Sequence, residues 1–256
     1  MDPIILGTLA SLVAGLATSI GAIPILFGRE ISDFWLDVML GFAAGVMFAA
    51  SAFSLLVPAL ELPTGGVYVV SAGLLAGGVF IHVIDRWAPH KHLITGLKEG
   101  KTDSSVSKRL AATWLFIIAI TIHNFPEGLA VGVSFGGGEI ETGLVVATAI
   151  GLQNIPEGTA VALPLVREGY SRWRALGITT FTGLVEPVGA ALGVIAVSFA
   201  TGMLGFGMAF AAGAMIFVVS DEIIPESHRK GHERPATFGV VFGFFIMMFL
   251  DNLIAV

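Results

Sequence analysis

The sequence of 256 residues contains no cysteine and few charged side chains. Without cysteine, disulfides and thiolate metal sites are excluded, so nitrogen, oxygen or thioether atoms would have to hold any bound metal. Only 12% of the residues are charged, against about a quarter in a typical soluble domain. In contrast, 55% are hydrophobic and the mean hydropathy is +0.89. The chain is therefore predicted to lie in a membrane, with no nucleic acid among its partners.

Apolar runs of roughly 20 residues, long enough to cross a lipid bilayer, recur along the chain. They are predicted at about 4–27, 35–59, 66–85, 111–134, 142–165, 175–199, 203–226 and 236–255. The first is interpreted as a retained span rather than a signal peptide, because no basic region precedes it. Only short loops remain, so residues 1–256 are predicted to form a single all-α domain, an eight-transmembrane-helix bundle.

Lysine and arginine are absent from every predicted span. All thirteen lie in the loops that follow the first, third, fifth and seventh spans, which share one side of an eight-span bundle. Basic residues in short loops stay cytoplasmic, so both termini are predicted to be extracytoplasmic. The protein is predicted to be a multi-pass protein of the cytoplasmic (inner) membrane, with a cytoplasmic loop at about 86–110.

Three glutamates, Glu127, Glu157 and Glu186, lie near the middle of predicted spans. A charged side chain at the bilayer centre costs about 2.5–3.5 kcal/mol on insertion scales. Because no lysine or arginine within a span can pair with them, these carboxylates are expected to bind protons, a metal cation, or each in turn.

Two related motifs, 123-HNFPEG-128 and 153-QNIPEG-158, contain the first two of these glutamates. Helical spacing places His123 and Glu127 on one face, with Asn124 on the adjoining stripe. The proline before each glutamate cannot donate a backbone hydrogen bond, so each helix is expected to kink. The second motif repeats this spacing with Gln153, Asn154 and Glu157. Imidazole, carboxylate and amide ligands suit Zn²⁺, Fe²⁺, Mn²⁺, Co²⁺ or Cd²⁺.

With these motifs the chain resembles the ZIP (Zrt/Irt-like protein) family of divalent-metal transporters, in its prokaryotic branch. The eight predicted spans, the outward termini and the long loop after the third span agree with that resemblance. It implies a central, binuclear metal site between the fourth and fifth helices, lined by His123, Asn124, Glu127, Gln153, Asn154, Glu157 and Glu186. Many family members carry a histidine or an aspartate at one of the first two positions of the second motif. This chain has neutral amides at both, which leaves its metal preference open.

Other residues are weaker candidates for metal ligands. Met47 lies in the second span, but a thioether is a soft, weak ligand and ordinary packing is the alternative. Four more are predicted to form an exit relay where the seventh span meets the cytoplasm, with an ordinary polar helix end as the alternative: Glu222, Glu226, His228 and His232.

The sequence thus predicts a transporter, not an enzyme, that moves divalent transition-metal ions into the cytoplasm, zinc first among them. A homodimer is one assembly that the sequence leaves open. One alternative is an intramembrane metalloprotease, but its H-E-x-x-H motif is absent from the sequence. A metal sensor that transports nothing is the other alternative.

Overall fold

The computed structural model describes residues 2–28, 31–87, 105–138 and 140–254, and these ranges contain helices but no β-strand. The predicted all-α class is therefore confirmed. The helices are α1 (Pro3–Leu26), α2 (Asp33–Ala49), α3 (Val57–Glu61), α4 (Val67–Trp87), α6 (Ser105–Gly136), α7 (Ile140–Arg167), α8 (Arg172–Gly183), α9 (Glu186–Phe199), α10 (Leu204–Val218), α11 (Ile224–His228) and α12 (Glu233–Ile254).

Within the described ranges, seven helical segments are long and apolar enough to cross a membrane. They correspond to all the predicted spans except the fifth, which forms α7. Helix α7 has 28 residues, but two prolines and the polar second motif interrupt its apolar character. A polytopic membrane bundle is therefore confirmed, while the count of eight spans stays a prediction. Most of the predicted loop at 86–110, including His90 and His92, lies outside the described residues.

Proline shapes several of the long segments. The sixth predicted span is broken between α8 and α9, because Pro187 near the start of α9 cannot continue the helix from Gly183. The second and seventh segments instead contain π-helical turns, Ala50–Leu56 and Val219–Ile223, each just before a proline-containing helix. Helices α6 and α7 continue through Pro126 and Pro156, so the kinks expected there stay a prediction.

Close glycine contacts divide the helices into two groups. In the first helix group (α1, α6, α7, α8 and α9), a Cβ on Gly158 would lie 1.8 Å from the carbonyl oxygen of Thr18. In the second helix group (α2, α3, α4, α10, α11 and α12), a Cβ on Gly45 would lie 2.0 Å from that of Val240. Each described helical glycine whose Cβ would come within 3 Å of another helix's backbone meets its own group. Such glycines let helix backbones approach closely.

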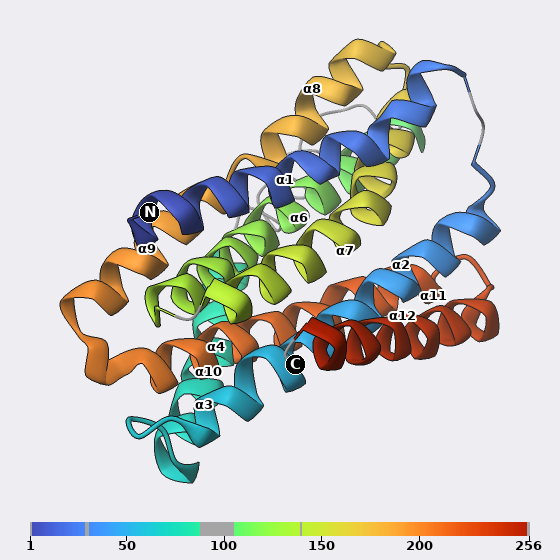
Figure 1. Cartoon of the computed structure of the whole chain (residues 1–256). Coiled ribbons are helices and arrows are strands. Elements are labelled where there is room, and N and C mark those ends of the chain that lie inside the picture. The colour runs from blue at the N-terminus through green and yellow to red at the C-terminus, as the bar shows by residue number, and fades with distance from the viewer. Residues whose placement is uncertain (1, 29–30, 88–104, 139, 255–256) are drawn as a thin grey trace.

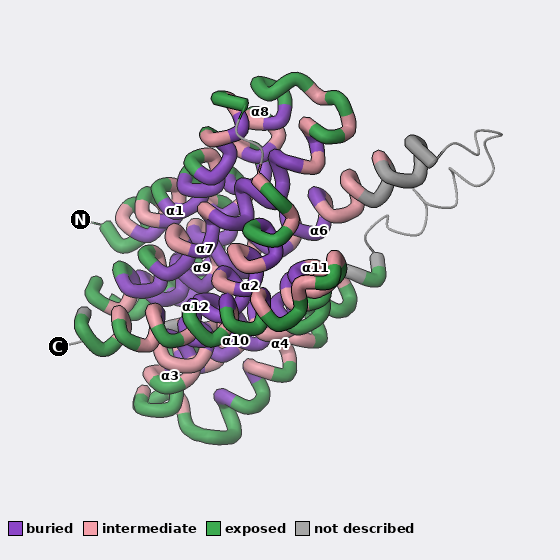
Figure 2. Tube along the Cα trace, turned by 90° about the vertical axis from the view of Figure 1, so that its right-hand side faces the viewer, coloured by how far each residue is buried: buried purple, intermediate pink, exposed green. Residues whose placement is uncertain are grey.

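Figure 1 shows these groups as two layers, with α1, α6, α7, α8 and α9 in the upper part and α2, α11 and α12 in the lower part. The layers meet where α7 packs against α2 and α6 packs against α10. Buried residues concentrate in the middle of the bundle, as Figure 2 shows, and the outer faces of the helices are exposed. That exposed surface includes Phe238, Phe242, Phe245 and Phe249 of α12, as expected for a surface in contact with lipid.

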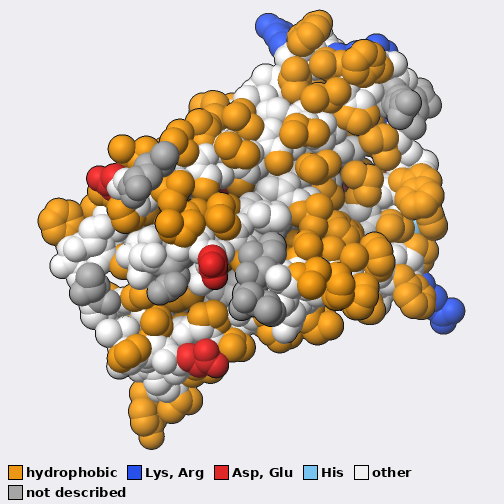
Figure 3. Space-filling model, in the orientation of Figure 1, with side chains coloured by type: hydrophobic (Ala, Val, Ile, Leu, Met, Phe, Trp, Pro, Cys, Tyr) orange, Lys and Arg blue, Asp and Glu red, His pale blue; other side chains and the backbone are white. Residues whose placement is uncertain are grey.

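Basic side chains gather at one end of the molecule. In Figure 3, Lys and Arg side chains lie at the top and at the right, whereas the visible Asp and Glu side chains lie towards the left. The end with Arg167, Arg172, Arg174, Arg229 and Lys230 is called the basic end below. The N and C marks lie on the same side in Figure 2, and α1 runs from the N mark to the end of the molecule where α8 begins (Figure 1).

Candidate metal centre

Three carboxylates from three different helices meet inside the first helix group. Glu127 of α6 and Glu186 of α9 are 0% exposed, and Glu157 of α7 is 1% exposed. Each is close enough to at least one of the others for electrostatic repulsion. Three glutamates buried in one helix group carry a large desolvation penalty, which a bound cation or protons would offset.

Local packing explains why these carboxylates converge. Gly128, next to Glu127, has no side chain to hold α9 away, and a Cβ there would lie 1.9 Å from the carbonyl oxygen of Glu186. The break before Pro187 makes Glu186 the first residue of α9. A carboxylate at a helix N-terminus is stabilised by the helix dipole. The break therefore makes Glu186 a favourable place for negative charge.

The two amides of the second motif contact the carboxylates directly. Gln153 Nε2 donates a hydrogen bond of 2.6 Å to Glu127 Oε1. Asn154 Nδ2 donates one of 2.7 Å to Glu186 Oε1 and another of 2.8 Å to the carbonyl oxygen of Ala14. Both amides thus use their NH₂ groups towards negative oxygen, which leaves their own carbonyl oxygens free to act as ligands.

The site contains many buried polar atoms without a hydrogen-bond partner among the described residues. They are His123 Nδ1, both amide atoms of Asn124, Glu127 Oε2, Gln153 Oε1, Asn154 Oδ1, both oxygens of Glu157, and Glu186 Oε2. Buried polar groups are nearly always satisfied by protein, water or an ion. A set composed mainly of carboxylate and amide oxygens, with one imidazole nitrogen, fits a divalent transition metal.

His123 connects this site to the second helix group. Its Nε2 lies 2.8 Å from Glu222 Oε1, on the π-helical turn between α10 and α11. In the described part of the chain, no three His, Asp or Glu side chains are already arranged to hold an ion. Since amides hold one oxygen each of Glu127 and Glu186, some of these side chains would have to turn to surround a metal.

The weaker candidates lie in different surroundings. Met47 is fully buried on α2. Glu226 forms an ion pair of 3.1 Å with Arg229. His228 Nδ1 lies 2.7 Å from the carbonyl oxygen of Ile224, and its Nε2 lies 3.2 Å from Thr237 Oγ1. His232 Nδ1 lies 2.8 Å from Asp37 Oδ2. Of the four residues in the predicted relay, Glu222 is thus the one that contacts the central site.

Sequence reasoning missed three polar contacts near the basic end. Asp37 is fully buried next to His232. The feature of the sequence that could have indicated this contact is a carboxylate inside an apolar run. Asp33 Oδ1 contacts both Arg167 and Lys230. Nothing in the spacing along the chain relates these three residues, which come from separate segments.

Comparisons with known proteins show the family of the chain. The sequence profile of the family described as ZIP zinc transporter matches residues 88–251. The chain is 46% identical to the zinc transporter GufA of Myxococcus xanthus over 252 residues, covering 96% of this chain and 97% of the relative. It belongs to the ZIP zinc transporter family.

More distant ZIP relatives extend to animals. The zinc transporter ZIPB of Bordetella bronchiseptica is 44% identical over 253 residues, with 92% of this chain and 77% of that protein covered. The human zinc transporter ZIP11 is 35% identical over 299 residues, with 84% of this chain and 87% of that protein covered.

Membership of the ZIP family confirms the resemblance inferred from the two motifs. It makes the chain a multi-pass membrane transporter of divalent metal ions rather than an enzyme. An intramembrane metalloprotease and a non-transporting sensor are not favoured.

Proposed function

We propose that this chain carries Zn²⁺ across the cytoplasmic membrane into the cytoplasm, as one transporter domain spanning residues 1–256. The observation that carries the proposal is the cluster of Glu127, Glu157 and Glu186, fully or almost fully buried with unpartnered oxygens. The cluster requires a positive charge, and no lysine or arginine lies within any predicted span. The basic end then faces the cytoplasm, and both termini are extracytoplasmic.

The proposed ligands lie in the fourth and fifth predicted spans and at the start of α9, and they suit two metal subsites. Glu127, Gln153 and His123 would form one subsite, and Asn154 and Glu186 would form the other. The hydrogen bonds from Gln153 to Glu127 and from Asn154 to Glu186 support this division. The complete ligand set is His123, Asn124, Glu127, Gln153, Asn154, Glu157 and Glu186, with Met47 as an additional thioether.

Acidic side chains on both sides of the site support a path for the ion. Away from the basic end, Glu141 and Asp251 line a cavity of about 150 Å³, and Ser54 Oγ donates a hydrogen bond to Asp251. Carboxylates at an entrance attract cations. Towards the basic end, Glu222 beside His123 would be the first group of the exit relay, with Glu226, His228 and His232 beyond it.

Movement of the two helix groups against each other would give alternating access to the site. The carboxylates all belong to the first helix group, whose helix backbones pack closely against one another at glycines. Such a group can move as one body, and the ion can move with it or become exposed on either side. Cd²⁺, Fe²⁺, Mn²⁺ and Co²⁺ are further proposed substrates, and a homodimer is the proposed assembly.

Uptake of zinc into proteoliposomes tests the proposed function. Purified protein is expected to accelerate Zn²⁺ entry over protein-free liposomes, and Cd²⁺ is expected to compete more strongly than Mn²⁺, because it resembles Zn²⁺ more closely in its preference for nitrogen ligands. Uptake should slow at lower pH, since protons compete for carboxylate and imidazole. No uptake above the protein-free liposomes would overturn the proposal.

Asn154→Asp provides a separate test of the second subsite. The added carboxylate is expected to raise the number of bound Zn²⁺ ions towards two and to tighten binding about tenfold or more, because a charged oxygen ligand replaces a neutral one. Isothermal titration calorimetry measures both quantities. Asn252→Asp, in the last turns of α12 where the side chain is exposed, is the matched control. Unchanged stoichiometry and affinity in the Asn154 variant would contradict a subsite at that position.

A further inference from the structure

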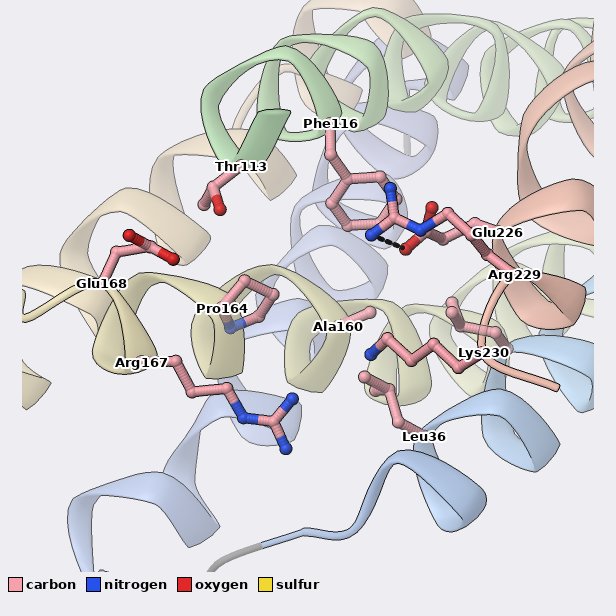
Figure 4. Close-up of a pocket in the computed structure, with 11 residues that line it drawn as sticks. Leu36, Thr113, Phe116, Ala160, Pro164, Arg167, Glu168, Glu226, Arg229 and Lys230 are labelled. Carbon is pink, nitrogen blue, oxygen red and sulfur yellow. Dashed lines mark ion pairs between the residues drawn. The ribbon is translucent and has the colours of Figure 1, made fainter. Parts of the chain in front are cut away.

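A cavity at the basic end lies between the two helix groups. Its volume is about 200 Å³. Phe116 of α6 and Ala160 of α7 line it from the first helix group, and Leu36 and Leu40 of α2 line it from the second. Figure 4 shows charged side chains around it, from the ends of α7 and α11 and the residues that follow each helix. Ala160 follows Glu157 by three residues, about 4.5 Å along a helix axis, so the cavity reaches to within one turn of the site.

One ion pair bridges the two helix groups at this cavity. Arg167 Nη1, at the end of α7, lies 2.7 Å from Asp33 Oδ1, at the start of α2. Arg167 Nη2 also donates to the carbonyl oxygen of Ile31 at 3.2 Å. Lys230, which follows α11, places its Nζ 2.8 Å from the same Asp33 oxygen. One oxygen of the Asp33 carboxylate therefore contacts one basic side chain from each helix group.

We propose that Asp33 and Arg167 form a latch that holds the two helix groups together at the basic end and limits how far the exit cavity opens. This inference rests on the proposed function, since it assigns the latch to the path by which the ion leaves. Opening the cavity separates α7 from α2, and that separation breaks the contact between Arg167 and Asp33.

The strength of the pair suits a contact that breaks in every cycle. The Arg167 and Asp33 side chains are 43% and 41% exposed, and exposed ion pairs are weak because water and salt screen them. When the latch opens, Asp33 keeps its contact with Lys230, since both belong to the second helix group. Arg167 is already accessible to water. Opening therefore leaves no charge buried without a partner.

Labelling of a single introduced cysteine tests the latch, because the natural chain has none. Ala160→Cys places a thiol in the cavity wall at a position that is 1% exposed. In nanodiscs, a water-soluble maleimide is expected to react slowly with this variant and about twofold to fivefold faster when Asp33→Asn is added. High salt should accelerate labelling when Asp33 is present and have little effect when it is asparagine.

Arg229→Gln is the matched control. It removes a positive charge from the same cavity, but its ion pair with Glu226 lies within the second helix group. Its labelling rate should equal that of Ala160→Cys alone. Arg167→Gln removes the other partner of the latch, so its labelling rate should match that of Asp33→Asn. Combining the two substitutions should give no further increase in that rate.

These outcomes separate the latch from the proposed function. Equal labelling rates for the Asp33, Arg167 and Arg229 variants would overturn the latch even if the protein takes up zinc. Acceleration by only one of the Asp33 and Arg167 variants would overturn it too. Labelling requires no metal, so faster labelling in a protein that fails to take up zinc would refute the proposed function and leave the latch supported.

Discussion

Replacing Glu127 or Glu157 by alanine is expected to lower Zn²⁺ uptake by at least about a hundredfold. Loss of an outer-shell partner of a metal ligand already lowers metal affinity by about 10- to 100-fold, and these carboxylates are proposed as direct ligands. Each also carries an oxygen without a partner among the described residues. Uptake into proteoliposomes measures the rate, and calorimetry measures whether zinc binding is lost in parallel.

The control for these substitutions is Glu233→Ala, at the exposed start of α12, which should leave uptake unchanged. Glu127→Gln and Glu157→Gln separate ligand loss from misfolding. Without metal, these variants should unfold at the same temperature as the natural chain or at a higher one, because a buried charge has been removed. Added Zn²⁺ should stabilise the natural chain and not the variants. Undiminished uptake by the alanine variants would contradict the proposed site.

Gly158→Ala is expected to destabilise the first helix group by about 1–3 kcal/mol or more. Its Cβ would lie 1.8 Å from the carbonyl oxygen of Thr18 on α1, and a backbone atom cannot turn aside as a flexible side chain can. Helix α1 and helix α7 must therefore separate. Because Glu157 is the neighbouring residue on α7, uptake should fall as well. The measurement is the thermal unfolding temperature in detergent, together with uptake.

Gly177→Ala is the matched control for Gly158→Ala. Gly177 also lies within a helix, α8, but a Cβ there would meet nothing within 4 Å. Alanine should stabilise that position by about 0.5–1 kcal/mol, because glycine loses more conformational entropy in a helix. If Gly158→Ala unfolded at the same temperature as Gly177→Ala, close contact between α1 and α7 would not be holding the group together.

The sequence alone determined the class of the protein and showed which polar residues lie within its apolar spans. Apolar runs long enough to span a bilayer predicted the helices, since hydropathy and helix length are local properties. The spacing of His123 and Glu127 placed them on one face of α6. The two motifs also indicated the ZIP family, and the comparisons confirmed it.

The tertiary structure decided which of these residues meet. The contact between His123 and Glu222, the amide hydrogen bonds to Glu127 and Glu186, and the pairing of Asp33 with Arg167 each join separate helices. Helical spacing fixes the face on which a residue lies within one helix. It does not fix how that helix is rotated or shifted against its neighbours. Within the first helix group, the close glycine contacts between α1, α6, α7 and α9 do so.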